Sequence, residues 1–237
     1  MTKMDKTKDI VIDKKTIIYD GIKASIPVIM GYLPIGIAYG LLATKAGLSG
    51  LTTVLMSVFV FAGSSQLIAV NMISAGTGII PIVIMTFLVN LRHILMSASL
   101  SLHFSNTDRK LLPLLGFVIT DESFAVGSVK FKNYSRKDLF YLTLGVSNYF
   151  GWVFSSWLGV IIGNFLNKTT FPGIDFVLPA MFIVLLVMQI QRRLDVFIAI
   201  ISAALSLSFV FILPENWNII AATVIAATMG VFFERWK

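Results

Sequence analysis

Several residues that can carry charge or form hydrogen bonds lie inside segments that are otherwise apolar. Arg92 stands between Asn90 and His93 in one such segment, and Asp121 and Glu122 are adjacent in the next. A charged side chain at the centre of a lipid bilayer costs about 2.5–3.5 kcal/mol on insertion scales. Charges kept at that cost must be paired, hydrated or neutralised by a proton. These residues therefore indicate ion pairing, proton coupling or binding of a charged solute within a membrane.

Arg92 is the one cation within the predicted spans, so we expect it to lie close to Asp121 or Glu122. A desolvated carboxyl group is suited to carry a coupled proton. Asn90 and His93 share one face of a regular helix, whereas Arg92 points roughly the other way. Either the helix is distorted here, or Arg92 serves a different neighbour. The structural alternative is an ion pair that only locks two helices together.

A second polar group occupies the centre of the preceding apolar segment, at Gly63, Ser64, Ser65 and Gln66. Four small or polar residues in a row weaken a membrane helix. The N-terminal end of a half-helix that starts there carries partial positive charge and suits a carboxylate. The alternative is serines bonded back to their own helix. Asn148, further along the chain, is predicted to reach the same cavity as the acids.

The fold class is all-α: a polytopic transmembrane bundle of about eight spans, with seven as the alternative count. A span needs roughly 20 mostly apolar residues. Residues 27–40 hold Pro27, Pro34, Gly36 and Gly40, so broken helices are expected near spans one and two. Gly36 and Gly40 also form a small-xxx-small pair, which lets another helix approach closely. The predicted spans are 24–43, 51–73, 79–100, 111–129, 139–163, 174–190, 196–213 and 217–233.

Composition supports a membrane protein, because 57% of the 237 residues are hydrophobic and only 13% are charged. The net charge of +7 fits topology and contact with anionic lipid better than nucleic-acid binding. The chain contains no cysteine, and we expect no cofactor, no metal site and no enzymatic activity. The predicted domains are 1–23, a cytoplasmic tail that could form an interfacial helix, and 24–237, the transmembrane transporter domain.

Basic residues set the predicted orientation. With eight spans and the N-terminus inside, most of them fall in cytoplasmic segments, and both termini are cytoplasmic. A seven-span model can place the basic loop 130–138 outside, which the positive-inside rule disfavours. The basic residues assigned to the outer segments are Lys45, Arg109, Lys110 and Lys168.

Five sequence pieces together resemble the AzlC family, the large subunit of AzlCD/BrnFE-type branched-chain amino acid exporters. The resemblance covers about residues 21–187. The matching pieces are Pro27 to Gly40, Phe61-Ala62-Gly63-Ser64-Ser65-Gln66, Asn90-Leu91-Arg92-His93, Thr120-Asp121-Glu122-Ser123-Phe124, and Gly173-Ile174-Asp175-Phe176 with Pro179-Ala180-Met181-Phe182.

The resemblance implies a permease of the bacterial inner membrane that exports leucine, isoleucine and valine, with methionine as a further candidate. It also implies coupling to the proton gradient and a small AzlD-type membrane subunit as partner. From the residues alone, a passive channel, an exporter of another small zwitterionic or organic solute, and an intramembrane enzyme using His93 stay open. Efflux against a gradient would separate an exporter from a channel.

Overall fold

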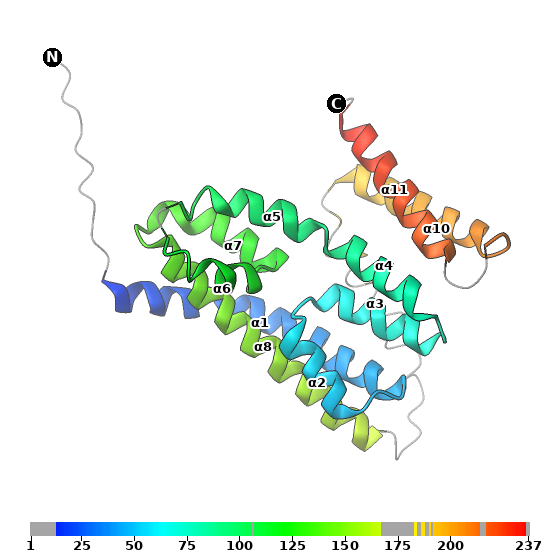
Figure 1. Ribbon diagram of the computed structural model, residues 1–237, viewed down its shortest axis with the longest axis horizontal. Helices are drawn as coiled ribbons and strands as arrows, with labels where there is room; N and C mark the ends of the chain where they lie inside the picture. The colour runs from blue at the N-terminus through cyan, green and yellow to red at the C-terminus, as the bar shows by residue number, and fades with distance from the viewer. Residues whose placement is uncertain are drawn as a thin grey trace. The chain divides into compact units, whose positions relative to one another are not determined.

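The computed structural model describes residues 13–105, 107–166, 183, 186–187, 190, 192–213 and 217–235. Regular structure in these ranges is entirely helical, which confirms the all-α prediction (Figure 1). The span predicted at 174–190 lies largely outside the described residues, as does the motif piece at 173–182. The helices are α1 Lys14–Lys45, α2 Gly50–Phe59, α3 Gly63–Ser74, α4 Ile79–Asn90, α5 Arg92–Ser101, α6 Leu112–Phe117, α7 Asp121–Lys130, the 3₁₀ helix η1 Phe131–Asn133, α8 Lys137–Leu166, α10 Arg193–Phe209 and α11 Trp217–Arg235.

The chain divides into two compact units. Unit 1 contains residues 1–33 and 91–154, and unit 2 contains residues 34–90 and 155–237. Helices α1 and α8 each contribute residues to both units. Unit 1 also holds α5, α6 and α7, whereas unit 2 holds α2, α3, α4, α10 and α11.

Two stretches within the described ranges are long and apolar enough to cross a membrane, Lys14–Lys45 and Ile79–Ser101. The first has 32 residues and is therefore about 48 Å long as an α-helix, more than the hydrocarbon core requires. Helix α2 and residues Ala221–Phe233 are shorter apolar helices. The positions of the remaining predicted crossings stay predictions.

The predicted break in span one is wrong, because α1 is one continuous helix from Lys14 to Lys45. Its glycines instead allow close packing against α8. A Cβ atom on Gly36 would collide with the Ser155 side chain, and one on Gly40 would lie 2.5 Å from the carbonyl oxygen of Ser156. This confirms the small-xxx-small prediction. The residues predicted to form an interfacial helix are continuous with the span from Lys14 onward.

Helices α1 and α8 run in the same direction. In unit 1, Gly21 faces Thr143 and Gly151 faces Ile29. In unit 2, the same order continues, since Gly163 faces Thr44. Residue numbers therefore increase in the same direction along both helices, so the two helices are parallel.

The predicted break in span two is confirmed. Helix α2 ends at Phe59 and α3 begins at Gly63. Between them Phe61 has a φ of 44°, in the left-handed region that side chains other than glycine rarely adopt. Span three is also interrupted, at Leu91 between α4 and α5. Leu91 itself keeps helical backbone angles, and Arg92 and Asn90 have different neighbours, Asp121 and Ser65, as the second alternative expected.

The segment predicted as span four does not cross unit 1. Helix α6 is six residues long, and α7 starts after residues 118–120. The ring of His103, before α6, lies 4.9 Å from the ring of Phe131, after α7, and Phe104 lies 5.7 Å from the same ring. A pocket of about 220 Å³ is likewise lined by residues 102–107 and 135–138.

Helices α6 and α7 thus form a hairpin that begins and ends at one end of unit 1. The eight-span prediction had put residues 101–110 and 130–138 on opposite sides of the membrane, which this geometry contradicts. The physical reason is that six apolar residues in α6 cannot reach across a bilayer, and the capped start of α7 turns the chain back.

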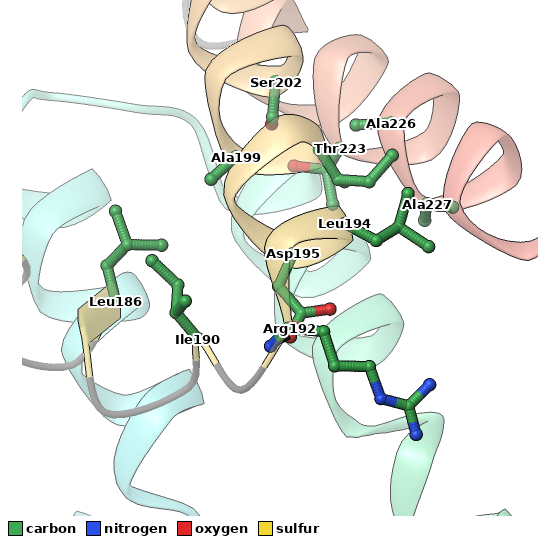
Figure 2. A pocket seen from close by; sticks show the side chains of 12 residues that line it. Leu186, Ile190, Arg192, Leu194, Asp195, Ala199, Ser202, Thr223, Ala226 and Ala227 are labelled. Atoms are coloured by element: carbon green, nitrogen blue, oxygen red, sulfur yellow. Dashed lines mark hydrogen bonds between the residues drawn. The ribbon is translucent and has the colours of Figure 1, made fainter. Parts of the chain in front are cut away.

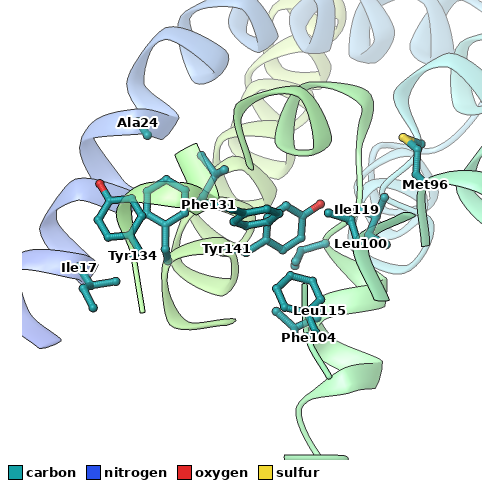
Figure 3. Close-up of a cluster of buried hydrophobic side chains, with 13 residues drawn as sticks. Ile17, Ala24, Met96, Leu100, Phe104, Leu115, Ile119, Phe131, Tyr134 and Tyr141 are labelled. Carbon is teal, nitrogen blue, oxygen red and sulfur yellow. The ribbon is translucent and has the colours of Figure 1, made fainter. Parts of the chain in front are cut away.

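The buried core of unit 1 surrounds this hairpin. It joins Ile17 of α1, Leu100 of α5 and Leu115 of α6 to Tyr141 of α8 (Figure 3). Phe131 lies among them with 2% of its surface exposed. Tyr134 stacks on Phe140 at 4.5 Å and donates a hydrogen bond to Asp20 of α1. These contacts hold the end of α7 beside α1, α5 and α8.

Candidate functional site

The two adjacent acids occupy the first turn of α7. Thr120 is the N-cap residue: its side chain accepts a hydrogen bond from the Ser123 backbone N–H, and its own N–H donates to Ser123 Oγ at 2.8 Å. This reciprocal cap starts the helix directly before Asp121 and Glu122. Free N–H groups and the helix dipole favour negative charge there. The sequence Thr-Asp-Glu-Ser therefore builds a carboxylate-bearing helix start within an apolar hairpin.

Arg92 forms an ion pair with Asp121, as predicted. The guanidinium nitrogen Nη1 lies 2.5 Å from Asp121 Oδ2, and both side chains are partly exposed. The interruption at Leu91 makes Arg92 the first residue of α5. His93 follows in the same turn, is half-buried, and makes no hydrogen bond within the described part of the chain. The pair leaves Asp121 neutralised by a neighbouring cation.

Glu122 has a different partner, which sequence reasoning missed. The Tyr32 hydroxyl of α1 lies 2.8 Å from Glu122 Oε2, to which it donates, and 3.0 Å from Thr120 Oγ1. The Tyr32 ring packs edge-on against Trp152 of α8 at 5.4 Å. No ion pair to Glu122 is present among the described residues. The signal that could have found Tyr32 is its place in mid-span, where a phenol needs a hydrogen-bond partner.

Asn148 of α8 is fully buried, with 0% of its surface exposed. Neither its Oδ1 nor its Nδ2 atom has a hydrogen-bond partner within the described residues. A buried polar atom without a partner costs about 1–3 kcal/mol, so an amide with two such atoms weakens the fold. This makes Asn148 an unusual residue for a position that an apolar side chain could fill.

The polar residues of the second group are largely engaged inside unit 2. Gln66 donates from Nε2 to Ser57 Oγ at 3.0 Å, and Ser57 donates to Ser156 Oγ of α8 at 2.8 Å. Asn90 donates to Ser65 Oγ at 3.2 Å, while its Oδ1 atom has no partner in the described ranges. These bonds fasten the start of α3 to α2, α4 and α8.

Gly63 and Ser64 lie in the first turn of α3, after Ala62, which provides no side-chain cap. The Ser65 hydroxyl bonds back to the Ala62 carbonyl at 2.9 Å, as the structural alternative expected. The first helical backbone bond runs from the Gln66 N–H to the Ala62 carbonyl. That this turn binds a carboxylate stays a prediction.

The predicted site residues fall into both units. Unit 1 holds Arg92, His93, Asp121, Glu122 and Asn148, and the structure brings Arg92 to Asp121 there. Unit 2 holds Gly63, Ser64, Ser65, Gln66 and Asn90, and the structure brings Asn90 to Ser65 there. That all ten line one cavity stays a prediction.

A cavity of about 420 Å³ in unit 2 lies between α10 and α11 and contains none of the predicted residues. Small and apolar side chains such as Ala199 and Ala226 line it, with Arg192 and Asp195 at one edge (Figure 2). Asp195 accepts a hydrogen bond from the Arg192 backbone at 2.8 Å, so this carboxylate caps the start of α10.

Long apolar helices, interrupted spans and an ion pair at the interruptions define a class of protein: an integral membrane protein that handles a polar solute. Comparison with known proteins identifies the family within this class. The AzlC family model matches residues 27–166, and the chain belongs to this family. As a member, it is a membrane transport protein and not an enzyme.

Three relatives illustrate the similarity. A membrane protein of Helicobacter pylori is 32% identical over 78% of this chain and 84% of its own length. The branched-chain amino acid transport protein AzlC of Bacillus subtilis is 30% identical over 87% of this chain and 80% of its own. The inner membrane protein YgaZ of Escherichia coli is 30% identical over 73% and 74%. No solved structure matches the chain significantly.

Proposed function

We propose that this chain exports branched-chain amino acids across the bacterial inner membrane. The substrates are leucine, isoleucine and valine, with methionine as a further candidate. The similarity to the Bacillus subtilis transport protein supports this substrate class. The proposal includes coupling to the proton gradient, a small AzlD-type membrane subunit as partner, and cytoplasmic termini.

The observation that carries the proposal is the unequal pairing of the two acids. Arg92 neutralises Asp121, whereas Glu122 is paired, among the residues that the structure describes, with the neutral Tyr32 hydroxyl alone. A carboxylate without a cation in an apolar environment favours either a proton or a cationic ligand. The ammonium group of an amino acid and the coupled proton are the two occupants that export requires. Glu122 is therefore assigned to bind them, and Asp121 to hold Arg92 in place.

Amino acid efflux from dipeptide-loaded cells tests the proposal. Cells without their own exporters are loaded with dipeptides that contain leucine, isoleucine, valine or methionine, and the released amino acids are measured with and without the small subunit. Export against a concentration gradient is expected only when both subunits are present. Passive equilibration would instead indicate a channel, and release of none of these amino acids would overturn the substrate class.

Substitutions of the acids test the mechanism. Glu122→Gln should reduce efflux at least about 10-fold, because it removes the charge and keeps the size of the side chain. Asp108→Asn is the matched control, since Asp108 is an exposed loop carboxylate that accepts a backbone hydrogen bond from Lys110. If Glu122→Gln and Asp121→Asn both retain proton-coupled efflux, the assignment of the acids is wrong.

A further inference from the structure

Asn148 is the residue of unit 1 that the fold itself does not explain. Its amide is fully buried and lacks a partner at both polar atoms within the described chain. The neighbouring Ser147, by contrast, satisfies its hydroxyl by bonding back to the Thr143 carbonyl at 2.8 Å. Buried polar groups are almost always hydrogen-bonded in native proteins, so an exception requires a reason. A ligand that supplies the missing bonds is one such reason.

The packing of α8 shows where the Asn148 side chain points. Residues three positions away on a helix flank its face on either side. A Cβ atom on Gly145 would lie 2.5 Å from Val118, just before α7, and one on Gly151 would lie 2.7 Å from Ile29 of α1. Asn148 therefore faces the wedge between α1 and the segment that precedes α7.

This wedge has the two kinds of side chain that an amino acid site needs, polar groups for the charged backbone and apolar groups for the aliphatic side chain. Tyr32 and Trp152 pack together beside it, and Tyr32 holds Glu122 by a hydrogen bond. Glu122 in its ionised form accepts hydrogen bonds only, whereas an amide offers one acceptor oxygen and a donor NH₂ group. Ile29 and Val118 supply aliphatic walls.

We infer that Asn148 binds the backbone of the substrate, an α-amino acid zwitterion, through both atoms of its amide. Its Nδ2 donates to the substrate carboxylate, and its Oδ1 accepts from the ammonium group that Glu122 neutralises. Tyr32 is a positioning residue that keeps Glu122 directed at this ammonium group. The inference rests on the proposed function and deepens it, because it assigns the recognition of the charged backbone to unit 1.

Leucine binding to the purified protein with its small subunit tests the inference. Asn148→Leu keeps the branched shape of the side chain and removes both unpaired atoms. We expect this variant to be at least as heat-stable as wild type without leucine, while its leucine affinity falls at least about 10-fold. Ser147→Ala, one residue away, is the matched control and should bind leucine as wild type does.

A second measurement keeps the test valid if Asn148→Leu does not fold. Wild type and Asn148→Ala are compared for binding of leucine, of isoamylamine, which lacks the carboxylate, and of 4-methylpentanoate, which lacks the ammonium group. Wild type should prefer leucine over each analogue about 10-fold or more. In Asn148→Ala the preference over isoamylamine should fall towards one, whereas the preference over 4-methylpentanoate should fall less, because Glu122 still recognises the ammonium group.

The outcomes separate the inference from the proposed function. Unchanged leucine affinity and unchanged discrimination in the Asn148 variants would overturn the inference and leave the proposed function standing. Failure of wild type to bind leucine at all would overturn both.

Discussion

Replacing Gly40 by alanine should force α1 and α8 apart. The added Cβ atom would lie 2.5 Å from the Ser156 carbonyl oxygen and 2.6 Å from the Val160 nitrogen. Ordinary contacts begin at about 3.4 Å, so the two backbones must separate by roughly 1 Å. Because both colliding atoms belong to backbone, no side-chain rotation relieves the clash. A gap of this size forfeits a quarter to a half of each van der Waals contact along the interface.

The expected cost of Gly40→Ala is about 1–3 kcal/mol, as for other overpacked sites. Gly31→Ala in the same helix is the matched control, because its Cβ would meet nothing within 4 Å. That change should stabilise α1 by about 0.5–1 kcal/mol through helix propensity alone. The stability changes of the two variants are therefore expected to differ in sign as well as in size.

Thermal unfolding of the purified protein in detergent measures the difference. For a chain of this size 1 kcal/mol shifts Tm by about 2–4 °C. Gly40→Ala should lower Tm by about 2–12 °C, and Gly31→Ala should leave it unchanged or raise it slightly. Equal Tm values for the two variants, or a larger loss for Gly31→Ala, would refute the close packing of α1 and α8.

Three further predictions concern unit 1. Arg92→Asp and Asp121→Arg should each reduce folded protein in membranes, because an unpaired charge in the bilayer costs about 2.5–3.5 kcal/mol, and the double exchange should restore most of it. Arg136, which neighbours Asp138, lowers the pKa of the Asp138 carboxyl group. Asp138→Asn should therefore destabilise the protein by up to about 1 kcal/mol at neutral pH. In unfolding experiments the difference in stability from wild type should vanish as pH falls through that lowered pKa. The chain has no cysteine, so single cysteines at Thr107 and Ser135 should react with a membrane-impermeant thiol reagent from the same side, whereas labelling from opposite sides would contradict the hairpin.

The sequence alone predicted two features of the structure, an ion pair and a helix break, because each is caused by polar residues within an apolar segment. Arg92 was the one cation within the predicted spans, so its pairing with Asp121 or Glu122 was expected from the cost of burying a charge, and the structure shows Asp121. The run of small and polar residues at Gly63 likewise predicted the break before α3. Both inferences needed only composition and local order, which a single sequence contains.

Proline and glycine in span one misled the prediction for a physical reason. Both residues weaken helices in water, but in a membrane the backbone has no solvent with which to replace its internal bonds. Helix α1 therefore stays continuous, and Gly36 and Gly40 serve close contact with α8 instead. Which of the two roles a glycine takes depends on the neighbouring helix, and the sequence does not identify that neighbour.

The hairpin of α6 and α7 shows a related limit. Residues 111–129 have the length and hydropathy of a span, but the contacts of His103 and Phe104 with Phe131 show that the chain turns back. Once it turns back, Arg109 and Lys110 belong to the same end as the basic loop 130–138. The hairpin removes one crossing from the eight-span model and so changes the side assigned to every later segment. The count of basic residues made for eight spans therefore no longer decides the orientation, because that count depends on knowing which apolar segments cross.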